Sequence, residues 1–354
     1  MKLSKLEDLE LENQLKLLNK PAIKIIKMKP TLTRRAQNPD TSSMANRSSS
    51  IWLKDNGCPL GTIPIRRIIK DDLIRQRNIP PPEGIIFESP LTNINNNSEP
   101  KTSYISSQGY KLAIVQIPYD PNNKFVGAGM SASLWNPHIE SQQHTACRLK
   151  IQKGSDILQV GWRVDPTLYG DTKTRSFIHF QAGNIHCFNT LCPGFIIVNR
   201  DFPVDASFDN FQHRGDKSAS EITMFIDRDF VNGNWWLLYD ESNVEVGFWP
   251  QKIFTELRSF ADNVEWGGVA YSESGVPEPP MGSRCFPIGD PNYDAYCRRF
   301  NVLNDKGETI HIDKTNVRVD DPNHYGLKDV PHWRGGKDQH MAFYGGPGGF
   351  ETLC

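Results

Sequence analysis

Hydrophobic and polar positions change their pattern at about residue 103. Beyond it, short β-branched and aromatic runs are separated by Gly, Pro, Asn and Asp, which is typical of antiparallel strands joined by turns. The runs follow one another too closely for crossover helices, except near 251–261, so the sequence predicts an all-β antiparallel sandwich rather than an α/β fold. The predicted strands are 110–117, 157–164, 174–180, 195–198, 220–227, 234–240 and 263–271.

The first 100 residues have a different pattern. Leucines recur at helical spacing between Ser4 and Asn19, and Pro21 ends the pattern, so we predict one amphipathic helix there. A Pro/Gly turn after Cys58 leads into a strand-like run and a short helical pattern, which the proline triplet 80–82 ends. The polar stretches 31–50 and 92–100 predict loops. We therefore expect a smaller α+β segment, residues 1–100, before a β-sandwich domain, residues 101–354.

The charge of the chain is unevenly distributed, although its net value is only −1. Residues 1–100 contain 16 Lys/Arg and 11 Asp/Glu, a balance of +5, and residues 101–354 contain 24 and 30, a balance of −6. The basic residues of the front part are scattered rather than clustered. This favours electrostatic pairing between the two parts over a nucleic-acid-binding arm.

No targeting or membrane segment is visible in the sequence. No apolar run approaches the roughly 18 residues that a membrane helix needs, and the N-terminus lacks the apolar core of a signal peptide. We expect either that a signal peptide has been removed or that the protein is cytosolic. Asn46 and Asn96 each begin an Asn-x-Ser triplet in a polar stretch, and both would be glycosylated in a secreted protein.

The cysteines allow two interpretations. They form no Cys-x-x-Cys pair and have no histidine at a spacing suited to zinc, so we predict neither a metal site nor a cofactor. Either all of them are reduced thiols in a cytosolic protein, or they form three disulfides and leave one unpaired in an oxidising compartment. The seven positions are 58, 147, 187, 192, 285, 297 and 354.

Several longer strings resemble the neprosin family of plant proteins. In the front part they are 3–12, 18–22 and 58–67, which resemble the family's activation peptide; in the back part they are 160–171 with 174–175, 187–195, 233–237, 246–250 and 264–268. The resemblance implies a secreted protein, extracellular or vacuolar, in which residues 1–100 inhibit a sandwich of two antiparallel sheets with a cleft. It also implies cleavage of peptide substrates after proline, at acidic pH, by two glutamates.

Both glutamate positions of the family differ in this chain. Gln159 stands before the Val-Gly-Trp string, and Val269 follows the Gly-Gly of Glu265-Trp-Gly-Gly. A glutamine cannot transfer protons, but it can donate a hydrogen bond to a carbonyl oxygen. Glu265 precedes position 269 by four residues, which is roughly 13 Å along a strand. We therefore expect Glu265 to approach the cleft centre only if Gly267 and Gly268 form a bulge.

Other residues have two possible roles. Trp162, Tyr169 and Trp266 would suit a substrate groove, but aromatic residues of a sandwich more often fill its core. His179, His186 and His213 lie near Ser176 and Asp171 in the sequence, but no Gly-x-Ser-x-Gly motif marks a nucleophile, so we predict no hydrolase triad.

The resemblance also implies cysteine pairings. It implies a Cys187–Cys192 disulfide, a partner for Cys354 in Cys297 or Cys285, and an unpaired Cys58.

Three hypotheses follow from the sequence. The first is a neprosin-like zymogen that Gln159 and Glu265 make active. The second is a non-catalytic sandwich that binds extracellular peptide or glycan in the former cleft, which the departures at Gln159 and Val269 favour. The third is a structural domain without a cleft ligand, which predicts that Gln159 and Glu265 lie far apart or point away from a common groove.

Overall fold

The computed structural model describes 4–19, 28–31, 63, 65–83, 86–87, 103–104, 109–199, 201–240, 242–310, 312, 314–335, 340–350 and 354. Cys58 and both Asn-x-Ser sites, Asn46 and Asn96, lie outside these residues.

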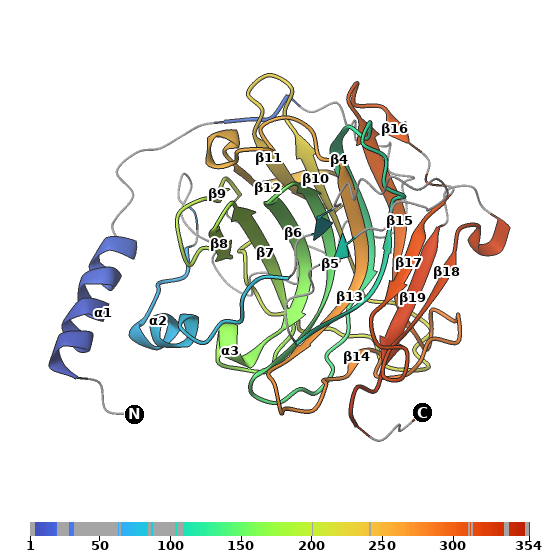
Figure 1. Cartoon of the computed structure of the whole chain (residues 1–354), viewed down its shortest axis with the longest axis horizontal. Coiled ribbons are helices and arrows are strands. Elements are labelled where there is room, and N and C mark those ends of the chain that lie inside the picture. The colour runs from blue at the N-terminus through green and yellow to red at the C-terminus, as the bar shows by residue number, and fades with distance from the viewer. Residues whose placement is uncertain are drawn as a thin grey trace, which may run out of the picture.

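Two antiparallel sheets form most of the molecule (Figure 1). The seven-stranded sheet has the order β17 (Asn316–Val319), β3 (Tyr110–Gln116), β13 (Asn263–Ser272), β5 (Gln143–Lys153), β6 (Asp156–Val164), β7 (Arg175–Ala182) and β8 (Ile185–Phe188). The ten-stranded sheet has the order β14 (Met281–Gly282), β19 (Met341–Gly346), β15 (Ala295–Asn304), β4 (Phe125–Ser133), β10 (Glu221–Arg228), β11 (Trp235–Tyr239), β12 (Val244–Trp249) and β9 (Ile196–Ile197), with β16 (Thr309–Ile310) on β15 and β18 (Gly326–Val330) on β19. The predicted all-β sandwich is confirmed.

The main core lies between the two sheets, and two tryptophans of the seven-stranded sheet form hydrogen bonds across it. Trp162 on β6 and Trp266 on β13 are fully buried, and each donates its indole N–H to a backbone carbonyl of β4: Ser133 at 2.9 Å and Gly129 at 3.1 Å. Strand β4 is built from small residues, and a Cβ on Gly129 would lie 2.0 Å from the ring of Phe225. Small residues there leave room for the large side chains around them.

The outer face of the seven-stranded sheet is covered by short helices. Helix α1 (Lys5–Leu18) begins with a Ser4/Glu7 capping box and confirms the predicted amphipathic helix. Helix α2 (Lys70–Gln76) contacts both α1 and α3 (Pro166–Tyr169); in Figure 1, α1 stands at the left edge, α2 lies between the other two helices, and α3 lies below β7. The 251–261 region, where the strand spacing left room for a helix, holds only the 3₁₀ turn η1 (Gln251–Ile253).

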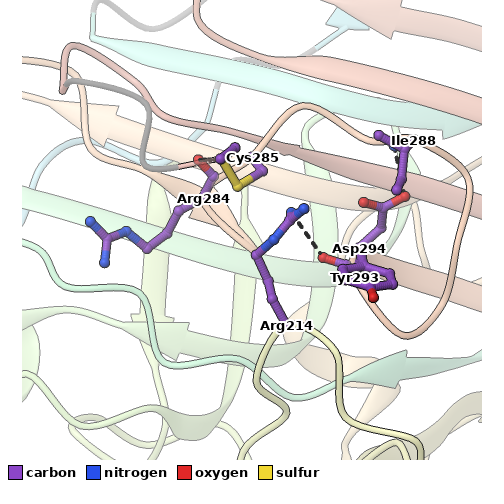
Figure 2. Close-up of a disulfide and its surroundings, with 7 residues drawn as sticks. Arg214, Arg284, Cys285, Ile288, Tyr293 and Asp294 are labelled. Carbon is purple, nitrogen blue, oxygen red and sulfur yellow. Dashed lines mark hydrogen bonds between the residues drawn. A yellow bond between two sulfur atoms is a disulfide. The ribbon is translucent and has the colours of Figure 1, made fainter.

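The disulfides match neither interpretation of the cysteines in full: two are present, and two of the described cysteines are free thiols. Cys187–Cys192 is confirmed, and Cys354 pairs with Cys285 rather than with Cys297. Figure 2 shows Cys285 near Arg214, whose guanidinium donates to the carbonyl of Tyr293 at 3.2 Å. The remaining described cysteines, Cys147 and Cys297, are buried free thiols with their sulfurs 2.9 Å apart.

None of the helices in the described part of the chain is long and apolar enough to cross a membrane.

The indole contacts predict a large loss of stability when one of them is removed. Trp266→Ala should lower the free energy of unfolding by about 3–5 kcal/mol, because it opens a cavity between the sheets and leaves the Gly129 carbonyl without its donor. Urea unfolding followed by circular dichroism measures the change. Phe230→Ala, at a ring that is 39% exposed, is the matched control and should change stability by less than about 1 kcal/mol. Equal losses in the two variants would contradict the proposed role of the indole.

Candidate active site

Gln159 and Glu265 lie in one row across the seven-stranded sheet. Gln159 on β6 is opposite Lys150 on β5, which is opposite Glu265 on β13. His179 on β7 extends the row on the other side of Gln159. The neighbours of these residues along each strand, such as Val160, Leu149 and Trp266, face the core. Side chains alternate between the faces of a strand, so the row lies on the outer face.

Regular strand register forms this row, without the expected bulge. Residues Asn263 to Ser272 pair one-to-one with β5, and Glu265 to Tyr271 pair one-to-one with β3. The strand has no bulge at Gly267 and Gly268, and Glu265 shares a row with Gln159 without one. Glu265 and Gln159 are aligned across the sheet because both are paired with Lys150 of β5, the strand between them.

Glu265 is fully buried and surrounded by donors. Its Oε2 accepts from Arg148 Nη2 at 2.8 Å, and its Oε1 accepts from Asn263 Nδ2 at 2.9 Å and lies 3.4 Å from Lys150 Nζ. Burial alone would raise the pKa of this carboxyl. The charges of Lys150 and Arg148 and the hydrogen bonds from Asn263 and Arg148 outweigh burial and lower the pKa from 4.5 to about 2. Glu265 therefore stays ionised in acid.

A carboxylate from the N-terminal segment, residues 1–100, enters the same site. Glu83 follows the proline triplet and is 6% exposed. Its Oε2 accepts from Gln159 Nε2 at 3.0 Å and from Arg148 Nη2 at 2.9 Å, and Arg148 Nε lies 3.1 Å from both of its oxygens. Tyr110 donates its hydroxyl to the Pro81 carbonyl at 2.9 Å. Glu83 thus contacts the row through Gln159, while Pro81 is bound farther along the sheet, at Tyr110.

The residues before this carboxylate are anchored to the same face. Ile68 and Leu73 pack in one apolar cluster with Val269 of β13. Asp72 pairs with Arg75 and Arg66, and Arg66 Nε reaches Asp205 of the β-sandwich domain at 3.7 Å. Burial raises the pKa of Asp205 to about 6, against the opposite effect of Arg66 and Arg175.

Helix α1 is tied to the same stretch. Asn19 at its end exchanges two hydrogen bonds with the backbone of Ile68, at 2.8 and 3.0 Å.

A family model with the description Neprosin matches residues 141–347, which is more than half of the chain. The chain belongs to the neprosin family. Its structure is also similar to Scytalido-glutamic peptidase with a peptide-based transition-state analogue (14% identity, TM-score 0.36, covering 67% of this chain and 98% of that one). A second similar structure is SCP-B, a member of the eqolisin family of peptidases in complex with the tripeptide Ala-Ile-His (13% identity, TM-score 0.35, covering 67% and 96%). Both TM-scores are too low to assign chemistry to this chain.

The two positions at which neprosin-family glutamates were expected have different surroundings here. Gln159 lies in the charged row and contacts Glu83. Val269 is opposite Ala146 and lies in the apolar cluster beneath the N-terminal segment. Position 269 therefore contributes packing, and the acid of β13 in the row is Glu265.

The aromatic residues of this neprosin-family domain do not line a groove over the row. Trp162 and Trp266 lie in the core, on the opposite face from Gln159 and Glu265, as strand alternation requires. Tyr169 is buried below Arg175, whose guanidinium carbon is 5.3 Å from the ring centroid. The core role that aromatics more often have is thus the one observed for both tryptophans.

Arg148, Lys150 and Glu83 are the site residues that sequence reasoning missed. A signal for the first two exists, because Cys147, Leu149 and Ile151 alternate with Arg148, Lys150 and Gln152, and this alternation marks a strand with one polar face. Glu83 has no such signal.

His179 belongs to the row although no hydrolase triad includes it. Burial and the nearby charges of His186, Arg163 and Lys150 lower its pKa well below the usual value.

Two other groups in the described part of the neprosin-family chain lie apart from this row. A small pocket at the Cys285–Cys354 disulfide includes Arg214 and Arg284. Glu278, Asp321 and His324 place possible ligand atoms within 4.8 Å of one another, but Asp321 already pairs with His324 at 2.8 Å and Glu278 with Lys111 at 3.5 Å. Neither group includes a residue of the row.

The lowered pKa of Glu265 predicts a pH-dependent contribution to stability. The carboxyl titrates near 4.5 when unfolded and near 2 when folded, so its contribution is complete above about pH 4.5 and is lost as the pH falls toward 2. The difference corresponds to about 3 kcal/mol. Urea unfolding at pH 5 and pH 2.5 should show this loss in the wild type and not in Glu265→Gln. The exposed-site variant Glu140→Gln should behave as the wild type does.

Proposed function

We propose that this protein is a secreted neprosin-type zymogen whose outer sheet face binds and cleaves proline-containing peptides at acidic pH once the N-terminal segment leaves. One observation carries the proposal: Glu83 of the chain's own N-terminal segment contacts Gln159 of the row and Arg148 beside it, and Pro81 contacts Tyr110 farther along the same sheet. An extended peptide already occupies the face. Removal of that peptide opens the same contacts to a substrate.

The donors around Glu83 suit an oxygen that becomes negative. Gln159 Nε2 and Arg148 Nη2 both lie about 3 Å from one Glu83 oxygen. A scissile carbonyl oxygen at that point would receive both hydrogen bonds as charge develops on it. Arg148 Nη2 also contacts Glu265, so the carboxylate holds the guanidinium in place.

Glu265 is the proposed base of this site. It remains ionised at pH 3 because its pKa is lowered to about 2. A water molecule would attack the carbonyl carbon and give a proton to Glu265. As the C–N bond breaks, the carboxyl would pass the proton to the leaving nitrogen, which restores the carboxylate.

The proline preference rests on the way residues 80–82 are held. Proline has no backbone N–H, so a proline run can be recognised through its carbonyl groups and its rings. Tyr110, which is 3% exposed, donates to the Pro81 carbonyl. The two disulfides are compatible with an oxidising, extracellular or vacuolar location.

A second candidate is a non-catalytic protein that binds peptide or glycan on this face. The specific observation in its favour is that both oxygens of Glu265 are engaged by Arg148, Lys150 and Asn263. A carboxylate held in this way is a weak base. Position 269, the other glutamate position of the family pattern, is a valine.

Acid treatment of the full-length chain tests the zymogen directly. At about pH 3 the mass should fall as cleavage near residues 90–105, a range that follows β1 (Ile86–Phe87) and includes β2 (Ser103–Tyr104), releases the N-terminal segment. Hydrolysis of a proline-rich peptide should then begin, and Glu265→Gln should abolish it. Glu10→Gln, at an exposed position of α1, is the control. An intact chain at pH 3 with no peptide turnover would contradict the proposal.

Substitution of Gln159 separates the two candidates. Gln159→Glu places a carboxylate at the family's glutamate position and next to Glu83, so like-charge repulsion should speed release of the segment and turnover should rise about tenfold or more. Gln159→Met keeps the volume without the donor and should lower turnover about 100-fold. Steady-state kinetics on one peptide measures both. For a non-catalytic binder, neither variant turns over peptide while binding persists.

A further inference from the structure

The N-terminal segment places an acidic side chain directly after a proline run, and we infer that the site selects peptides in which Glu or Asp follows proline. The inference rests on the proposed function and names the class of peptide that the face takes. Arg148 and Gln159 are the residues that read the acidic side chain.

The contacts of Glu83 are those of a built carboxylate subsite. Arg148 presents Nε and Nη2 to the two oxygens in a fork, at 2.9–3.1 Å, and Gln159 adds a third donor at 3.0 Å. Arg148 is 1% exposed and Gln159 is 5% exposed, so these donors are fixed and shielded from water. A carboxamide in this place would turn an N–H group toward the guanidinium, and a lysine would bring a like charge.

Buried cations on this face also favour an anion. The buried cations on β5 and β6 are Arg148, Lys150 and Arg163. Asp165 pairs with Arg163 at 2.7 Å, and Glu265 lies between the other two cations. Glu83 of the N-terminal segment adds a carboxylate beside Arg148, at 2.9 Å. Since a buried, uncompensated charge is costly, an anionic ligand gains more on this face than a neutral one.

The backbone contact sets where the acid must stand in the peptide. Tyr110 binds the Pro81 carbonyl, two residues before Glu83. Recognition at these two points leaves one residue between the bound carbonyl and the acid. In residues 80–83 that intervening residue is also a proline.

The first experiment uses the chain as its own ligand. Residue 83 is changed from Glu to Asp, Gln and Lys in the full-length protein, and hydrogen exchange is followed over residues 65–83. Glu83→Gln should open this stretch about 10- to 100-fold more often, Glu83→Lys more than that, and Glu83→Asp less than either. Glu10→Gln on α1 should leave the exchange unchanged. Equal exchange in all four residue-83 proteins overturns the inference.

The second experiment presents the acid in trans. Full-length Glu83→Gln is titrated calorimetrically with acetyl-Pro-Pro-Pro-Glu-amide and with its Gln counterpart. The acidic peptide should bind at least tenfold more tightly, and adding Gln159→Met should reduce that preference severalfold. Equal affinities overturn the acidic subsite but leave a peptide-binding face. If neither peptide binds at millimolar concentration, Glu83 serves only to hold the N-terminal segment on the sheet, and the inference is overturned. An acidic preference without hydrolysis sustains the inference and removes the proposed peptidase activity.

Discussion

The arrangement of this protein depends on one guanidinium that holds two carboxylates in a buried place. Arg148 contacts Glu265 from β13 and Glu83 from the N-terminal segment, and it reaches both through Nη2. Removing such charges from water costs several kcal/mol per ion, and close pairing is what offsets the cost. A face that contains Arg148 and Lys150 is therefore stable only with enough carboxylates against it. The domain and the N-terminal segment are coupled through this requirement.

At the site, the N-terminal segment contributes a negative charge and the sandwich domain a positive one, which is the reverse of their net charges. The front of the chain is basic and the back is acidic, which predicts cations of the first against anions of the second. Arg66 beside Asp205 follows that prediction. Glu83 beside Arg148 reverses it, at the centre of the covered face. Average charge describes long-range attraction between the parts, whereas a buried site is governed by the few groups in contact.

The sandwich core keeps this row of side chains in place. Trp162 and Trp266 project from the reverse of the strands that carry Gln159 and Glu265, and each is bonded to β4 of the other sheet. These two hydrogen bonds fix β6 and β13, the strands that carry Gln159 and Glu265, against the other sheet. Within that frame Gln159 and Val269 stand where the resemblance places the two glutamates, and Glu265, whose pKa is lowered to about 2, lies in the row with Gln159.

The sequence by itself determined the fold class, the amphipathic helix, the predicted strands and the close disulfide, because each depends on local periodicity or on strings of neighbouring residues. It also singled out Gln159 and Glu265, and the alternation along β5 contains the signal for Arg148 and Lys150. Only the tertiary structure decided that Gln159 and Glu265 share a row, since register between strands is set by pairing with β5 and not by spacing along one strand. It alone brought Glu83 to Arg148, 65 residues away along the chain, because packing of the segment on the sheet, and not spacing in the sequence, places the two side chains together; burial then strengthens their attraction.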